Sequence, residues 1–387
     1  VGLSGLITPS LEEMQYVAGE MQKDEHFRIK KIPLMIGGAT TSRVHTAVKI
    51  AHHYEGPVVY VPDASRSVGV AQSLLGDGAG AFIEELNADY DKVRRQHANK
   101  KQTPLWPLAK CRANKTPIDW TAYQPKTPKF IGRRVFKNFD LTELARYIDW
   151  GPFFQTWDLA GPYPAILTDE VVGVEATRVF ADAQAMLKRV VEGRWLTANG
   201  VIGLYPANTV NDDDIQLYTD ETRTDVALTW YGLRQQTEKQ AIEGVMRPSR
   251  CLADFVAPQS SGIADYAGMF AVTAGIGAEK KEAQFMAELD DYSSIMFKSI
   301  ADRLAEAFAE CLHHRVRTDL WGTSPQESLS IDDLVNEKYT GIRPAPGYPA
   351  CPDHSAKQDM FEVLQCAEIG MGLTESLAMT PAASVSG

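Results

Sequence analysis

Gly341-Ile-Arg-Pro-Ala-Pro-Gly-Tyr-Pro-Ala-Cys-Pro-Asp-His354 is the most distinctive stretch of this chain. Its four prolines fall within nine residues, and each one removes a backbone donor and fixes a φ angle, which excludes a helix or a central strand. The residues that precede proline are also pushed toward extended geometry. We therefore predict a stiff, mostly extended loop in which Gly347 is the one permissive joint.

Two side chains of this loop have the chemistry of a ligand site. The planar guanidinium of Arg343 suits a carboxylate, and Tyr348 offers an aromatic face with a polar tip. A stiff loop holds such groups in place before a ligand arrives, which lowers the entropic cost of binding. On composition alone, a rigid strap between two helices explains the stretch as well as a ligand site does, and both interpretations stay open.

Composition and charge limit the class of protein. The chain has 387 residues, enough for two or three domains, and its 44% hydrophobic and 23% charged residues are typical of globular proteins. A net charge of −11 without a long basic run argues against a nucleic-acid partner. No apolar run approaches the ~18 residues that span a membrane, and residues 1–4 lack the basic region of a signal peptide. We expect no membrane partner and a chain that begins inside a larger protein.

Cysteine and histidine spacing predicts no metal site. The five cysteines are scattered without a CxxC pair, which supports neither zinc nor a disulfide framework and fits a reducing cytoplasm. The adjacent pairs His52-His53 and His313-His314 point different ways on a helix. We interpret both pairs as solvated side chains.

The first 98 residues alternate apolar runs with helical segments. Apolar runs at residues 1–7, 32–36 and 57–61 each precede a loop of small residues and then a helix, which predicts an open parallel sheet with helices on both faces. Ser10 and Glu13 have the spacing of a capping box for the first helix.

The three loops lie where such sheets bind ligands, beyond the carboxyl ends of the strands. They contain neither GxGxxG nor a P-loop, so a dinucleotide or a nucleoside triphosphate is disfavoured. Ordinary helix capping is the alternative explanation for these loops.

The rest of the chain has a different pattern. Residues 97–128 contain five prolines and no periodicity, which indicates a linker or strap. Beyond them we predict helices at residues 171–195, 283–316 and 357–368, and strands at residues 201–205, 215–218, 223–228 and 269–273, with a hairpin turn at Asp220-Glu221. A strand meander with segregated helices argues for an α+β domain.

Two acidic residues of this part are ambiguous by themselves. Asp149 stands among aromatic and apolar neighbours at the end of a predicted helix, where a cap or a surface pair is the simpler explanation. Glu306 and Glu310 are spaced i, i+4 on the long predicted helix, so a solvated face is expected.

Residues 343–352 closely resemble the signature loop of the activation domain of cobalamin-dependent methionine synthases, and the similarity continues over essentially the whole chain. The matching stretches include residues 3–10, 36–42, 59–66, 169–173, 220–224, 252–258, 373–376 and 383–387. The resemblance implies a multidomain protein: an incomplete Rossmann-like (flavodoxin-like) cobalamin-binding domain over residues 1–98, then an α+β activation domain over residues 99–387, with residues 99–136 as a linker or strap. The chain departs from the family in a longer, more basic stretch at residues 242–250, and it stops at Gly387, where the family continues with an aromatic-rich segment that supplies further ligand contacts.

The resemblance also assigns ligand contacts. In the first domain it implies that Ser4, Thr8 and Ala64 contact cobalamin, that Gly37 and Gly38 lie beside its nucleotide tail, and that Ser10 belongs to the relay behind the axial histidine. In the second it implies that S-adenosylmethionine is bound by Asp149, Glu306, Arg343, the main chain at Ala345, and Tyr348.

The chemistry of S-adenosylmethionine agrees with that second set. An arginine can form an ion pair with the α-carboxylate, and acidic groups attract the ammonium and sulfonium charges. The methyl group on a sulfonium is already activated, so the protein need mainly position it against the cobalt.

The family's cobalt-ligating motif, Asp-x-His-x-x-Gly, does not occur in this sequence. The nearest match, Asp24-Glu25-His26, has Ile29 where glycine is required. We therefore expect neither a catalytic residue nor a metal ligand here, and we expect the axial histidine to lie upstream of Val1. His45 is the histidine nearest the loops, about a turn into a helix and too far along it to be a loop ligand.

The function follows from the resemblance. The whole enzyme transfers a methyl group from methyltetrahydrofolate to homocysteine through methylcobalamin, and the modules for those substrates, including a zinc site, are absent from this sequence. This part implies reactivation, in which cob(II)alamin is reduced by a flavodoxin-like electron donor and remethylated from S-adenosylmethionine. We expect a cytoplasmic methyltransferase whose partners are that donor and the upstream modules. A non-catalytic corrinoid-binding module and a separate corrinoid reactivation factor are the alternatives.

Overall fold

The computed structural model describes residues 1–7, 9–98, 104–242 and 244–387. The chain divides into two compact units, Val1–Pro104 and Leu105–Gly387. Across the described residues, no helix combines the length and the apolar character that a membrane span requires.

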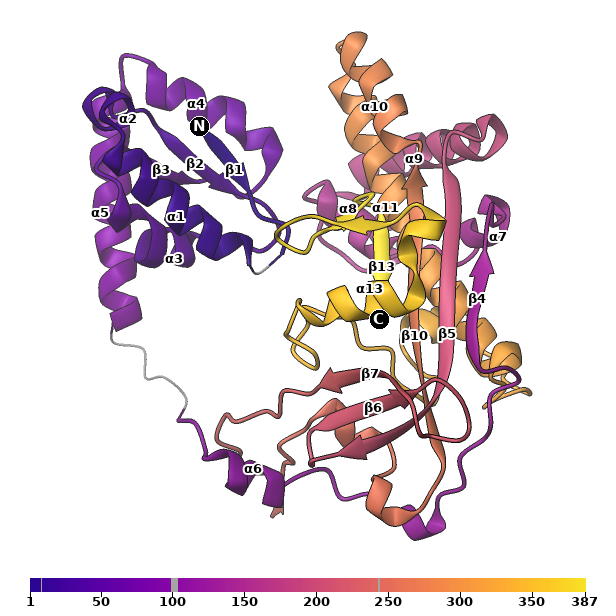
Figure 1. Cartoon of the computed structure of the whole chain (residues 1–387). Helices are drawn as coiled ribbons and strands as arrows, with labels where there is room; N and C mark the ends of the chain where they lie inside the picture. Colours follow the sequence, from indigo (N-terminus) through magenta and orange to yellow (C-terminus); the bar gives the residue numbers. More distant parts are fainter. Residues whose placement is uncertain (8, 99–103, 243) are drawn as a thin grey trace. The chain divides into compact units, whose positions relative to one another are not determined.

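The first unit is built on a parallel sheet of the strands β1 (Gly2–Ser4), β2 (Leu34–Gly37) and β3 (Val58–Tyr60), in that order (Figure 1). Its helices are α1 (Ser10–Lys23), α2 (Glu25–Lys30), α3 (Arg43–His45), α4 (Ser67–Leu75) and α5 (Ala79–Ala98), and α3 continues through a π-helical turn and a 3-10 turn to His53. Met14, Ala18 and Met21 of α1 pack on Leu34 and Ile36 of β2. The Tyr60 N–H donates to the Tyr90 hydroxyl at 3.0 Å, which ties α5 to β3.

The predicted capping box at Ser10 is wrong. Pro9 is the N-cap of α1 and already has helical geometry. Its carbonyl accepts hydrogen bonds from Glu12 N and Glu13 N, so Ser10 is the first helical residue and its side chain does not cap the helix.

The second unit is built on an antiparallel sheet with the strand order β13-β10-β5-β6-β7. These strands are β13 (Ser384–Ser386), β10 (Asp265–Ile276), β5 (Thr197–Val210), β6 (Asp214–Tyr218) and β7 (Val226–Tyr231). The long strand β5 also pairs with β4 (Gly132–Phe136) through residues 200–204, whereas its end pairs with β6. Two short hairpins, β8 (Ala241–Ile242) with β9 (Val245–Met246) and β11 (Gly372–Leu373) with β12 (Met379–Thr380), complete the strands described for this unit.

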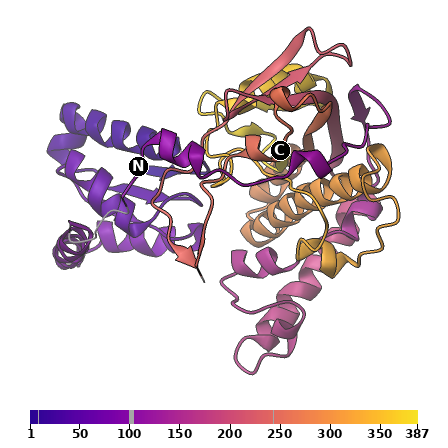
Figure 2. The same cartoon turned by 90° about the horizontal axis from the view of Figure 1, so that it is seen from below.

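Helices pack on both faces of this sheet (Figures 1 and 2). One face carries α7 (Leu141–Ala145), α8 (Gly151–Thr156), α9 (Gly173–Gly193), α10 (Ala278–Ala287) and α11 (Asp291–Arg315), which share a core with β5 and β10. The other face is covered by α13 (Ala356–Leu364). The remaining helices are α6 (Leu108–Ala113) and α12 (Ile331–Val335). The parallel first sheet and the antiparallel second sheet with long helices confirm the predicted multidomain fold class.

The predicted helix over residues 283–316 is two helices. The break falls after α10, where Leu289 has a φ of +57°. Asp290 then starts a new helix, because its carboxylate accepts from Ser293 N at 3.0 Å. Strands β4 and β13 were not predicted, since each is short and is defined by pairing with a strand far away in the sequence.

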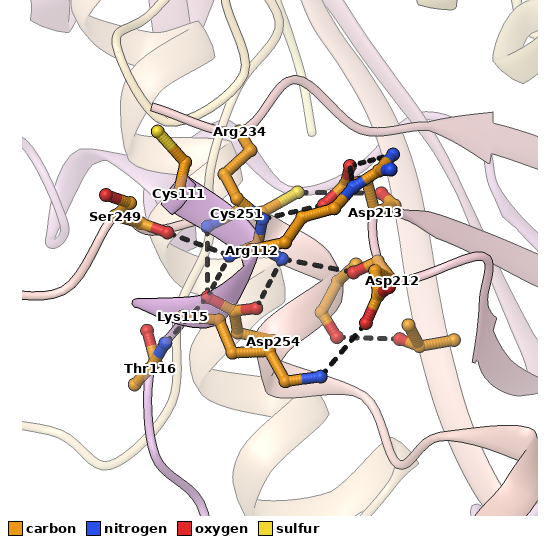
Figure 3. A network of polar contacts seen from close by, with 12 residues as sticks. Cys111, Arg112, Lys115, Thr116, Asp212, Asp213, Arg234, Ser249, Cys251 and Asp254 are labelled. Atoms are coloured by element: carbon orange, nitrogen blue, oxygen red, sulfur yellow. Dashed lines mark hydrogen bonds and ion pairs between the residues drawn. The ribbon is translucent and has the colours of Figure 1, made fainter. Parts of the chain in front are cut away.

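A buried ion network fastens residues 112–116 to the loops beside the second sheet (Figure 3). Arg234 is fully enclosed and donates to Asp213 at 2.6 Å and to Asp254 at 2.7 Å. Arg112 donates to the other oxygen of Asp213 at 2.7 Å, and Thr116 N donates to Asp254. This middle part of the predicted strap is therefore packed into the second unit.

Candidate functional site

The proline-rich loop over residues 341–354 folds back at its tip. Residues 342–345 have no regular secondary structure, but Gly347 N donates to Cys351 O at 2.8 Å, and Cys351 N donates to Tyr348 O at 2.9 Å. Gly347 has a φ of +104°, as expected of the permissive joint. The prediction of a mostly extended loop is wrong for residues 346–351, because these hydrogen bonds close a tight turn.

The start of the loop lies against the sheet of the second unit. Gly387 exchanges two backbone hydrogen bonds with Phe270 of β10. A Cβ at Gly387 would stand 2.7 Å from the Pro344 carbonyl oxygen, so the loop and the chain end are in direct contact. This contact leaves no room for a side chain at residue 387.

Arg343 is held by Glu310 of α11. Its Nη2 donates to Glu310 Oε2 at 2.8 Å, and the arginine side chain is 21% exposed. Arg343 Nη1 and Glu310 Oε1 are enclosed and have no hydrogen-bond partner. Burial raises the pKa of Glu310, although Arg343 and Arg317 act in the opposite direction.

Glu310 belongs to a polar stripe along α11 and the turn that follows it. The stripe consists of Asp302, Glu306, Glu310, His313 and Arg317, spaced three or four residues apart and therefore on one side of the helix. Asp302 and Glu306 are exposed, whereas Glu310 and Arg317 are buried. Although Asp302 is exposed as a whole residue, desolvation of its carboxyl group raises its pKa, and the nearby Glu306 charge adds to the increase. Two adjacent carboxylates at the open end of the stripe favour a cation there.

Tyr339 lies over the buried end of the stripe. The Arg317 guanidinium stands 4.0 Å from the centre of the Tyr339 ring, and the ring of His313 meets it edge-on at 4.9 Å. Arg317 also forms a two-point ion pair with Glu327. Burial, with the Arg317 and Arg343 charges, lowers the pKa of His313 to about 3.

Two sequence interpretations of this helix are wrong. Glu310 is 8% exposed and is not part of a solvated face. His313 is half-buried under Tyr339, and His314 shares a 2.9 Å hydrogen bond with the Tyr147 hydroxyl. The spacing of the stripe was the signal that could have identified Glu310, His313 and Arg317 together.

The other predicted S-adenosylmethionine contacts lie on separate elements. The Asp149 carboxylate precedes α8 and accepts from Gly151 N at 2.9 Å. Tyr348 is 65% exposed at the loop tip, and the half-buried Ala345 accepts from Tyr348 N. Arg343 is bonded to Glu310, which lies one helical turn along α11 from Glu306. In the described part of the chain, no hydrogen bond or ion pair joins Asp149 or Tyr348 to Arg343 or Glu306.

In the first unit, the predicted cobalamin contacts Ser4, Gly37 and Gly38 lie together at the carboxyl edge of the sheet. Ser4 lies beside Gly37 in the strand register, and Gly5 N donates to Gly37 O at 2.8 Å. Gly38 has a φ of +105°, and a Cβ there would collide with Gly5 O at 2.3 Å, so the first two loops pack on each other.

The remaining assigned residues of this unit are less closely joined. Ala64 is exposed beyond β3, Ser10 is half-buried, and Thr8 lies outside the described residues. The side chains of Ser4, Gly37, Gly38 and Ala64 are all small, so this edge of the sheet has little bulk.

His45 is the third residue after the N-cap Ser42 in α3. Burial lowers the pKa of its imidazole, and Nε2 is enclosed without a hydrogen-bond partner. Among the residues that the structure describes, no cluster of three or more His, Cys, Asp or Glu side chains is suited to a metal ion.

The chain is similar to known proteins in both sequence and structure. A family model for the vitamin B12 dependent methionine synthase activation domain matches residues 140–387, which include Asp149, Glu306 and the whole proline-rich loop. A crystal structure of the MetH reactivation domain bound to AdoHcy is similar over 74% of this chain and 86% of that chain. The two share 52% sequence identity with a TM-score of 0.70.

Proposed function

Because this chain belongs to the family of the vitamin B12 dependent methionine synthase activation domain, we propose that its second unit binds S-adenosylmethionine and presents the methyl group for the reactivation of cobalamin. The observation that carries the proposal is the 52% identical reactivation domain with AdoHcy bound. AdoHcy is S-adenosylhomocysteine, the product that remains after S-adenosylmethionine has transferred its methyl group. A site that holds one of these two molecules is therefore suited to the other.

In this proposal, each residue of the second unit contacts a different chemical group of the ligand. Arg343 takes the α-carboxylate, and its enclosed, unpartnered Nη1 is the donor available for it. Glu306 faces the cationic part of the ligand from the exposed end of the stripe. One oxygen of Asp149 accepts from Gly151 N, and the other is available to the ammonium group. The main chain at Ala345 and the ring of Tyr348 complete the contacts.

The chemistry required of these residues is positioning. The carbon–sulfur bond of a sulfonium breaks readily, so a fixed orientation of the methyl group supplies most of the catalysis. The carboxylates near the sulfonium stabilise the charged ligand before transfer, whereas neutral AdoHcy loses that attraction afterward. This difference favours release of the spent ligand.

The first unit would hold the cobalamin. When bound, this group supplies the nucleophilic metal centre that accepts the methyl group. Ser4, Thr8, Gly37, Gly38 and Ala64 would contact its organic part, with Ser10 in the relay behind the axial histidine. The small residues at the sheet edge fit such contacts.

We also propose protein partners and a cytoplasmic location for this chain. A flavodoxin-like protein would supply the electron for reduction, and the upstream modules would handle folate and homocysteine. All five cysteines are free and buried, as suits a reducing cytoplasm.

Calorimetric titration of the 387-residue chain tests the proposed function. We expect one equivalent of S-adenosylmethionine, and one of S-adenosylhomocysteine, to bind. Adenosine triphosphate shares only the adenosine part and is the matched control ligand. Absence of binding by either adenosyl amino acid would contradict the proposal.

A further inference from the structure

Glu310 is a buried carboxylate on a helix whose neighbours are mostly apolar. Ala307, Phe308, Ala309 and Cys311 are all buried beside it. A carboxylate in such a place costs free energy unless it is paired. Its partner is Arg343, the residue that the proposed function places on the ligand carboxylate.

We infer that Glu310 is a positioning residue that holds the Arg343 guanidinium in the orientation needed for the ligand carboxylate. This inference rests on the proposed function. Glu310 does not touch the ligand and acts through Arg343.

The single contact between the two residues supports this role. An arginine and a carboxylate often bind through two parallel hydrogen bonds. Here only Nη2 donates to Glu310, at 2.8 Å, and the enclosed Nη1 has no partner. The ion pair therefore fixes the guanidinium from one side and leaves a second donor for an incoming acceptor.

The charges around Arg343 explain why an acid is needed at residue 310. The Arg317 and Arg343 charges both depress the pKa of His313, so both guanidinium groups lie near the same imidazole. Arg317 has its own carboxylate, Glu327. Without Glu310, Arg343 would lose the carboxylate to which it donates, and its repulsion by the Arg317 charge would be less well balanced.

Two other roles are possible for Glu310, and they predict different measurements. A simple clamp on the loop would affect every adenosyl ligand alike. A competitor for the guanidinium would weaken binding in the unaltered chain, so its removal would strengthen binding. A positioning residue affects only ligands that carry the carboxylate.

Titration of Glu310→Ala and Glu310→Gln with two ligands distinguishes these roles. S-adenosylhomocysteine carries the carboxylate, and 5′-methylthioadenosine has the same nucleoside and thioether without it. For Glu310→Ala we expect about a tenfold weaker S-adenosylhomocysteine complex, comparable to the loss of one charge-assisted hydrogen bond. Glu310→Gln keeps an acceptor for Nη2 and should lose less. The affinity for 5′-methylthioadenosine should be unchanged in both variants.

A double-mutant cycle with Arg343→Ala completes the experiment. If Glu310 acts through Arg343, then Glu310→Ala should have no further effect on S-adenosylhomocysteine binding once Arg343 is replaced. Glu288→Gln, at an exposed position after α10, is the control.

Three results would overturn the inference alone: equal losses for the two ligands, tighter S-adenosylhomocysteine binding, or additive losses in the double variant. Failure of the unaltered chain to bind S-adenosylhomocysteine would instead overturn the proposed function, and this inference with it.

Discussion

The imidazole of His354 fills the space that a side chain at residue 347 would need. A Cβ on Gly347 would lie 2.3 Å from His354 Cε1, and the histidine is 8% exposed. The tip of the proline-rich loop is therefore fixed by two requirements on one residue: a positive φ and the absence of a side chain.

Gly347→Ala should destabilise the second unit and weaken ligand binding. Alanine at a φ of +104° is strained by about 1–2 kcal/mol, and the collision with His354 should add about 1–3 kcal/mol. Gly341→Ala is the matched control, because Gly341 has a φ of +125° but nothing within 4 Å of its Cβ position. Urea unfolding measures both variants, and equal losses would show that the His354 contact has no energetic role.

Arg343→Ala should weaken S-adenosylmethionine binding by about 2–4 kcal/mol while the second unit remains folded, because a desolvated charge pair with the ligand is lost. Calorimetry gives the affinity, and the circular dichroism spectrum reports the fold. Arg247, which is exposed, supplies the control variant Arg247→Ala. Equal affinities for Arg343→Ala and the unaltered chain would remove Arg343 from the site.

Glu306→Gln and Asp149→Asn should weaken S-adenosylmethionine more than S-adenosylhomocysteine. The sulfonium charge is what distinguishes these ligands, and each substitution removes one negative charge with little change in shape. We expect a selective loss of about 1 kcal/mol for each, the size of a partly screened charge interaction. Parallel titrations with the two ligands measure it, and identical losses would mean that these carboxylates do not sense the sulfonium.

Arg234→Met should destabilise the second unit by about 3–5 kcal/mol, because it leaves the buried Asp213 and Asp254 without their shared cation. Arg112→Met removes a half-exposed arginine from the same network and should cost about 1 kcal/mol or less. All seven tryptophans lie between residues 106 and 321, so tryptophan fluorescence during urea unfolding follows the second unit alone. A similar loss in both variants would contradict the importance that we assign to burial.

His313 should make the second unit acid-sensitive. Its pKa is lowered to about 3 in the folded chain, so below its ordinary value of 6.5 the unfolded chain binds a proton that the folded chain does not. Stability is therefore full above that value and falls as the pH decreases toward 3, by at most about 1.4 kcal/mol per pH unit. The charges of Arg317, Arg343 and His314 act on the ring, and Tyr339 packs against it; all four residues are present in both proteins that are compared.

His313→Gln should remove that component of the pH dependence. The measurement is the free energy of unfolding at pH 7.5 and pH 5.0, followed by tryptophan fluorescence, for the variant and the unaltered chain. An unchanged pH dependence in the variant would mean that His313 accepts its proton in the folded state.

Local pattern determined much of the architecture. Apolar runs followed by loops of small residues predicted the three parallel strands, because each strand, its loop and the following helix lie within about thirty consecutive residues. The helical spacing of residues 171–195 likewise predicted α9 (Gly173–Gly193), whose apolar stripe faces the core. The chemistry of the proline-rich loop, with its arginine and glycine, was also evident from the sequence, as was its resemblance to a known family.

Tertiary structure decided what depends on residues far apart. Strand β4 contains two arginines and shows little alternation, and it becomes a strand because β5 offers it a partner more than sixty residues away. The sequence alone predicted that Glu310 and Glu306 are both solvated. In the structure Glu310 is buried and paired with Arg343, whereas Glu306 stays exposed. Helical spacing specifies which residues share a face of a helix. Whether that face is buried depends on which distant segment packs against it. Burial in turn determines whether a carboxylate is a solvated charge or the partner of a ligand-binding arginine.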